Sequence, residues 1–88
     1  MNDLLAIEGV ELQTLRNQID ALDDAIAALL DERAKVSATI QASRLVTGRS
    51  RVDLVREREV FARYRDNLTM PGQEVPDAVL AYCRGRVA

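Results

Sequence analysis

The chain has 88 residues and a net charge of −2, and only three of its side chains are aromatic although 48% are hydrophobic. A domain of this size has one core that is only marginally sufficient, so a second chain often completes it. Histidine is absent and Cys83 is the one cysteine, which excludes an intrachain disulfide, a His–Cys metal cluster and histidine acid–base chemistry. No apolar run approaches the roughly 20 residues that span a bilayer, and no signal segment is evident, so we expect a cytoplasmic protein.

Residues from about 8 to 46 contain no proline and, after Gly9, no glycine. Apolar side chains recur there every three or four positions, which predicts one long helix. These seam residues are Leu12, Leu15, Ile19, Leu22, Ile26, Leu29, Val36 and Ile40. A helix of this length extends roughly 50 Å, whereas a compact domain of this size has a radius of gyration of about 12 Å. The helix outgrows its own domain, so we expect a dimer.

Arginines interrupt this apolar seam. Arg33 and Arg44 fall on it, and Arg16 borders it. A guanidinium inside a helical seam needs an anion beside it, because burying an unpaired charge is costly. Arg16 and Arg33 lie about 25 Å apart along one helix. The two could therefore meet one ligand only if an antiparallel partner helix supplied Arg16.

The segment TGRS at residues 47–50 is typical of a turn, and a second helix is expected at about 51–68. Its apolar face would carry Leu54, Phe61, Tyr64 and Leu68, with Glu57 on the same face. Asp53 lies one turn before Glu57, and Arg56 flanks both. A loop at residues 70–76 then leads to a third helix at about 76–85, with Pro76 in its first turn.

The middle of the chain is cationic, with seven arginines and three acids between residues 44 and 65. Such a cluster can be a solvated face, and Arg33 and Glu57 can form a purely structural ion pair. The balance favours a site instead, because the arginines outnumber Asp53 and Glu57 by about two. The arginines of this set are Arg16, Arg33, Arg44 and Arg56. Such a surplus suits a small organic dianion, since the arginine fork binds carboxylates bidentately, while the two acids could accept hydrogen bonds from a ligand hydroxyl.

The pattern LRNQIDALDDAIAALLDERAKVSATIQASR, followed by TGRSRVDLVRERE, resembles the all-helical class of chorismate mutase. The resemblance covers residues 12 to 65 closely and the rest loosely. It implies an all-α fold, with one long and two short helices per chain, in an intertwined homodimer. It also implies an intramolecular Claisen rearrangement of chorismate to prephenate, without cofactor, metal or covalent intermediate.

The resemblance also assigns roles to the charged residues. Arg33, Arg56 and Arg16 of the other protomer would hold the two substrate carboxylates. Arg44, where many members have lysine, would face the ether oxygen. Glu57, and less firmly Asp53, would bind the ring hydroxyl.

The end of the chain, RGRVA, resembles the short stand-alone members of this class. In those members the tail helps to line the site, which makes Arg84 and Arg86 candidates here; the alternative is a frayed, solvated terminus. Longer members complete the site with a serine and a glutamine or glutamate that this ending lacks. Some short members are activated by a deoxy-heptulosonate-phosphate synthase, so such a synthase is a candidate partner.

Three alternatives stay open at this point. Related helical proteins rearrange 4-amino-4-deoxychorismate or split isochorismate into pyruvate and salicylate, and Glu57 and Asp53 would meet the substituent at ring carbon four. A helical dimerisation or regulatory module is the alternative without catalysis. Nucleic-acid binding is not expected, because Arg33 and Arg44 point into the seam instead of outward among stacking aromatic residues.

Overall fold

The computed structural model describes residues 9–46, 48, 53–70 and 72–84, and within them the chain forms three α-helices and no strand. They are α1 (Gly9–Val46), α2 (Leu54–Asn67) and α3 (Glu74–Arg84). The prediction of an all-α chain with three helices is confirmed. The expected spans were about 8–46, 51–68 and 76–85. Residues 8, 51, 52 and 85 of these spans lie outside the described residues. The third helix, α3, begins two residues earlier than expected.

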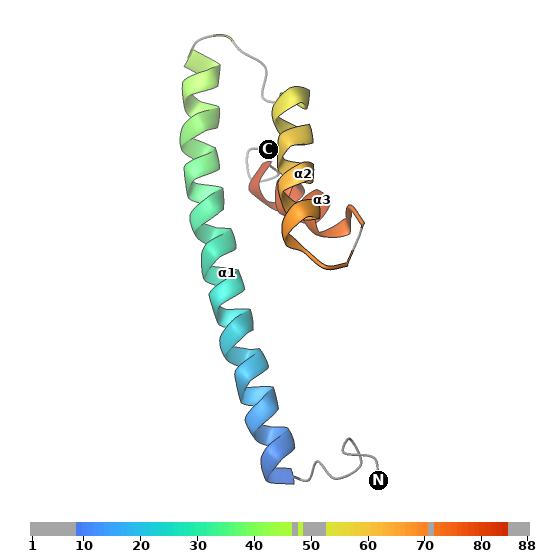
Figure 1. The fold of residues 1–88 in the computed structure, drawn as a ribbon. Coiled ribbons are helices and arrows are strands. Elements are labelled where there is room, and N and C mark those ends of the chain that lie inside the picture. Colours follow the sequence, from blue (N-terminus) through green and yellow to red (C-terminus); the bar gives the residue numbers. More distant parts are fainter. Residues whose placement is uncertain (1–8, 47, 49–52, 71, 85–88) are drawn as a thin grey trace.

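The helices form an elongated molecule. Figure 1 shows α2 and α3 beside the C-terminal half of α1, while the N-terminal half of α1 extends alone. The molecule measures 63 × 23 × 18 Å. Its radius of gyration is 18.3 Å, against about 12 Å for a compact chain of this length. The N-terminal half of α1 is thus beyond the reach of the other two helices of its own chain.

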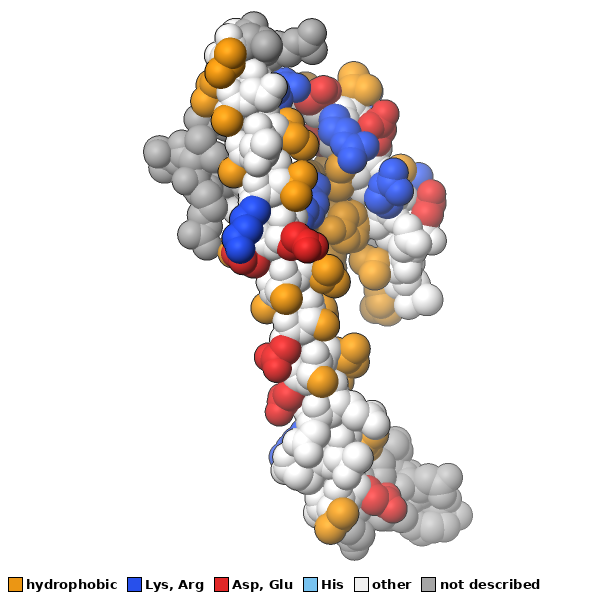
Figure 2. Space-filling model, turned by 90° about the vertical axis from the view of Figure 1, so that its left-hand side faces the viewer, with side chains coloured by type: hydrophobic (Ala, Val, Ile, Leu, Met, Phe, Trp, Pro, Cys, Tyr) orange, Lys and Arg blue, Asp and Glu red, His pale blue; other side chains and the backbone are white. Residues whose placement is uncertain are grey.

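The apolar seam of α1 is not covered within the chain. No residue of α1 is buried, and the exposed fraction of the seam residues runs from 39% at Leu12 to 65% at Leu29. Figure 2 shows hydrophobic side chains spaced along this helix on the face that it presents. Exposed apolar area of this extent on one side of a helix is unusual for a monomeric soluble protein.

The face of α1 that turns toward α2 and α3 lies next to the seam and is more polar. Its partly covered residues are Leu30, Arg33, Ala34, Ser37, Gln41 and Arg44, a spacing of three or four that places them along one side of the helix. Val36 and Ile40, on the seam itself, stay more than half exposed. In the single chain Arg33 is only half-buried, because the inward face of α1 is offset from its apolar stripe. Burial of Arg33 between two chains stays a prediction.

The turn after α1 and the first residue before α2 fix where the second helix starts. Gly48 has a φ of +77° and donates its backbone N–H to the carbonyl of Leu45 at 3.2 Å. Asp53 is the N-cap of α2: its carboxylate Oδ1 accepts from the backbone N–H of Arg56 at 3.1 Å. Its carbonyl accepts from the N–H of Glu57 at 2.9 Å. Capping of this kind satisfies backbone donors that a helix end otherwise leaves open, and it places Arg56 and Glu57 in the first turn.

The small core joins α2 to α3. Val60 of α2 and Val79 and Cys83 of α3 are buried, and α3 contacts both α1 and α2. Pro76, also buried, is the third residue of α3. Proline is tolerated there, because the first N–H groups of a helix have no partner within it. The core is thus small enough that each of its side chains matters for stability.

We predict that Val60→Ala lowers the free energy of unfolding by about 2 kcal/mol, because it removes two buried methyl groups and leaves a cavity. The measurement is urea unfolding followed by helical circular dichroism at one fixed protein concentration, since association contributes to apparent stability. Val55→Ala is the matched control, because Val55 lies on the same helix and is 63% exposed. Equal losses from the two substitutions would contradict the assigned core.

Candidate active site

One cavity of about 340 Å³ lies between the three helices and is lined by all of them. It is bounded by residues of α1, by Asp53 at the start of α2, by the first half of α2 and by the end of α3. Its lining residues are Arg33, Val36, Ser37, Ile40, Gln41, Arg44, Asp53, Arg56, Glu57, Val60, Leu80, Cys83 and Arg84. Five of the six residues that the sequence singled out as a substrate site thus line a single space.

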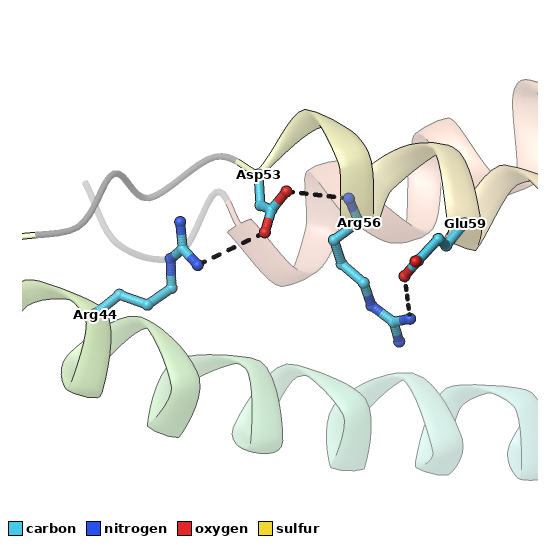
Figure 3. Close-up of polar contacts among 4 residues, drawn as sticks. All are labelled: Arg44, Asp53, Arg56 and Glu59. Atoms are coloured by element: carbon cyan, nitrogen blue, oxygen red, sulfur yellow. Dashed lines mark hydrogen bonds and ion pairs between the residues drawn. The ribbon is translucent and has the colours of Figure 1, made fainter.

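The α1 wall of this cavity is a polar row. Arg33, Ser37, Gln41 and Arg44 follow one another at steps of four, four and three residues, and each is half-buried. Figure 3 shows Arg44 reaching from α1 toward the start of α2, where its Nη1 lies 3.9 Å from Oδ2 of Asp53. The two oxygens of Asp53 therefore have different partners, since Oδ1 caps α2. One carboxylate links the position of Arg44 to the start of the second helix.

Arg56 enters the same space from α2. Its guanidinium extends toward α1 in Figure 3, and its Nη1 donates to Oε1 of Glu59 at 3.0 Å. Both side chains of this pair are 58% exposed. An ion pair this exposed contributes little to stability, so Arg56 can exchange Glu59 for another anion at small cost.

Glu57 is joined to the end of α3. Its Oε2 accepts a hydrogen bond from Nη1 of Arg84 at 2.8 Å, and the two residues are 27 positions apart in the chain. Their side chains are 21% and 34% exposed, so this is the most enclosed ion pair of the described residues. Glu57 itself is half-buried in the single chain.

The cavity has a surplus of positive charge. Four arginines and two carboxylates line it, which leaves about two positive charges without an acid of the wall. In the part of the chain that the structure describes, no group of three or more His, Cys, Asp or Glu side chains could hold a metal ion. The wall also offers neutral polar groups at Ser37 and Gln41. The arrangement suits a small molecule with two negative charges and a hydroxyl.

Among the described residues, one predicted site residue is not brought to this cavity. Arg16 lies on the N-terminal half of α1, 17 positions before Arg33, which is about 25 Å along the helix. Arg86 lies outside the described residues. A second cavity of about 300 Å³ adjoins the first and shares Arg33, Arg56 and Val60 with it. Within one chain the site therefore has an open side next to Arg33 and Arg56.

Seven lining residues were not among the predicted site residues: Val36, Ser37, Ile40, Gln41, Val60, Leu80 and Cys83. A signal existed for two of them, because Ser37 and Gln41 follow Arg33 at steps of four and so must share its side of the helix. Leu80 and Cys83 gave no such signal. Apolar residues on a short helix are expected in a core, and Cys83 is indeed buried.

Comparison with known proteins identifies the kind of protein that has this arrangement. The family model of chorismate mutase type II matches residues 15–83. The intracellular chorismate mutase of Mycolicibacterium smegmatis is 38% identical over 77 residues, which cover 88% of this chain and 74% of that protein. The protein of the same name from Mycobacterium tuberculosis strain H37Rv is 39% identical over 77 residues, covering 88% of this chain and 72% of its own length.

A solved structure shares the fold. It is a chain of the non-covalent complex of DAHP synthase and chorismate mutase from Corynebacterium glutamicum with a bound transition-state analogue, with a TM-score of 0.80 and 28% identity. The match covers 90% of this chain and 95% of that one. Together with the family model and the named relatives, this likeness places the present chain in the type II chorismate mutase family, whose members are isomerases.

Proposed function

We propose that this protein rearranges chorismate to prephenate in the cavity between its three helices. The observation that carries the proposal is the surplus of about two positive charges in a cavity lined by Arg33, Arg44, Arg56 and Arg84. Chorismate has two carboxylates, an ether oxygen and a ring hydroxyl, and each of these groups has a complementary side chain in or beside the wall. Membership of the family supplies the reaction class.

The chemistry explains why histidine and metal ligands are not needed. In a Claisen rearrangement one C–O bond breaks and one C–C bond forms within the same molecule, without transfer of a proton. Catalysis then consists of selecting the compact chair-like conformer and of stabilising the negative charge that grows on the ether oxygen. Fixed arginines can do both, because they never lose their charge and bind carboxylates through two parallel hydrogen bonds.

We assign the roles as follows. Arg33, Arg56 and the partner's Arg16 hold the two substrate carboxylates, and Arg44 faces the ether oxygen. Glu57 accepts the hydrogen bond of the ring hydroxyl. Asp53 is less suited to that task than the sequence suggested, because one of its oxygens caps α2 and the other faces Arg44.

An intertwined homodimer would complete this site. The seam of α1 is exposed along its whole length, and the N-terminal half of the helix extends away from α2 and α3 in Figure 1. A second copy lying antiparallel would cover the seam and bring its Arg16 toward the open side of the cavity, next to Arg33 and Arg56. Long coiled-coil-like seams of this kind stabilise dimers through interdigitating apolar side chains.

The proposal also covers location and partner. We place the protein in the cytoplasm, where its substrate would be made, in keeping with relatives that are named intracellular; among the described residues, no helix is long and apolar enough to cross a membrane. We further propose a DAHP synthase as a binding partner, because the similar protein of Corynebacterium glutamicum forms a non-covalent complex with one.

The first test is activity with chorismate, followed by its loss of absorbance and by identification of prephenate as product. We predict that Arg44→Gln lowers kcat by at least about 100-fold, since one preorganised donor at a developing oxyanion has an effect of that size. Arg44→Lys should retain more activity, because the charge stays. Arg58→Gln is the control, since Arg58 is exposed and lines neither cavity. Full activity of Arg44→Gln would remove Arg44 from the site. No prephenate from chorismate, together with pyruvate release from isochorismate, would favour the lyase alternative.

A mixing experiment tests whether two chains share the site. Arg16→Ala and Arg33→Ala should each be nearly inactive alone. After joint refolding, half of the dimers are mixed and each mixed dimer has one intact site, so we expect about a quarter of wild-type activity. Mixing Arg33→Ala with Arg44→Ala should restore nothing, because both residues belong to the same side of each site. Absence of recovery in the first mixture would contradict the shared site.

The partner proposal predicts that the synthase of the same organism raises kcat/KM for chorismate, on the order of tenfold, which is a usual size for coupling between two binding events. The measurement is a titration of the mutase with the synthase at fixed chorismate. Serum albumin at equal concentration controls for unspecific stabilisation. Turnover that does not change across the titration would exclude activation by this partner.

A further inference from the structure

Both carboxylates in the wall of the cavity already face an arginine. Oε2 of Glu57 accepts from Nη1 of Arg84 at 2.8 Å, and Oδ2 of Asp53 lies 3.9 Å from Nη1 of Arg44. The wall has no other acid. The site therefore contains no carboxylate whose charge is left uncompensated by a neighbouring guanidinium.

The pair of Glu57 and Arg84 is the better defined of the two. It is the shorter, its carboxylate is 21% exposed against 48% for that of Asp53, and it joins the first turn of α2 to the last residue of α3. Arg84 is held near Glu57 because Cys83, its neighbour in the chain, is buried in the core. A carboxylate has about four lone-pair positions on its two oxygens, so Glu57 can keep its bond to Arg84 and accept one more hydrogen bond from a ligand.

A neutral donor can form that additional hydrogen bond with a much smaller electrostatic free-energy penalty than a cation can. A hydroxyl that approaches Glu57 carries no net charge and is not repelled by Arg84. An ammonium group in the same place would lie within a few ångströms of the Arg84 guanidinium, in a cavity that already has two surplus positive charges. Like charges this close, partly shielded from water, repel each other strongly.

We propose that Arg84 is a specificity-determining residue, which orients Glu57 and selects substrates with a hydroxyl at ring carbon four over substrates with an ammonium group there. The inference rests on the proposed function and names the group that decides between chorismate and 4-amino-4-deoxychorismate. Arg84 acts through Glu57 and by its charge, so it is a positioning residue in this scheme and not one that reacts.

The test compares kcat/KM for chorismate and for 4-amino-4-deoxychorismate in wild type, Arg84→Gln and Arg84→Lys. Wild type should prefer chorismate. In Arg84→Gln the ratio of the two kcat/KM values should move toward the amino substrate by about tenfold or more, because a like charge near the substituent is removed. Arg84→Lys retains the positive charge and should keep most of the preference. A purely structural role of Arg84 would lower both activities together and leave the ratio unchanged.

Controls separate the possible failures. Arg58→Gln removes an exposed arginine that lines neither cavity and should leave the ratio at the wild-type value. Arg84→Met, which keeps the aliphatic stem, replaces Arg84→Gln if the latter loses helical signal. An unchanged ratio in the neutral variant, or a lysine variant that behaves like it, would overturn the role of Arg84 alone. Wild type that rearranges neither substrate would overturn the proposed function and the inference with it.

Discussion

The arrangement of this molecule depends on positive charge that is concentrated between three helices. Removing guanidinium groups from water is costly unless each finds an anion, and four of them line one cavity with two carboxylates. Asp53 faces Arg44, Glu57 binds Arg84, and Arg56 turns aside to Glu59. Every one of these pairs keeps some contact with solvent. A dianion in the cavity would therefore balance the charge that the chain alone leaves unbalanced, and this links ligand binding directly to the electrostatics of the fold.

Much of this arrangement could be predicted, because it depends on local rules. The period of the seam from Leu12 to Ile40, without proline or glycine, indicated α1. The spacing of Arg33 and Arg44 along that helix, and of Asp53, Arg56 and Glu57 around the start of the next, indicated two sets of side chains. Because α2 runs back alongside α1, these sets come together, and the five residues line one cavity. Their roles toward the substrate remain proposals.

The rest of the site depends on the angles at which the helices cross and on the offset between the two faces of α1. The residue pattern contains neither. The bond between Glu57 and Arg84 spans 27 positions and requires the particular direction in which α3 crosses the other helices. The seam pattern likewise did not show that the inward face of α1 is offset toward Ser37 and Gln41, which leaves Arg33 half-buried in the single chain. An apolar stripe shows which side of a helix needs cover. It does not show whether that cover comes from its own chain.

The offset between the two faces of α1 would connect the proposed association with the proposed catalysis. Val36 and Ile40 lie on the exposed seam and also line the rim of the cavity, between Arg33 and Arg44. A second chain that covered this seam would exclude water from the same rim. The effective dielectric constant around the arginines would fall, and their attraction to a bound dianion would rise, because Coulomb energy varies inversely with that constant. In this scheme the site of a single chain has the required residues but is too accessible to water. A dimer would supply Arg16 and would also exclude water from the site.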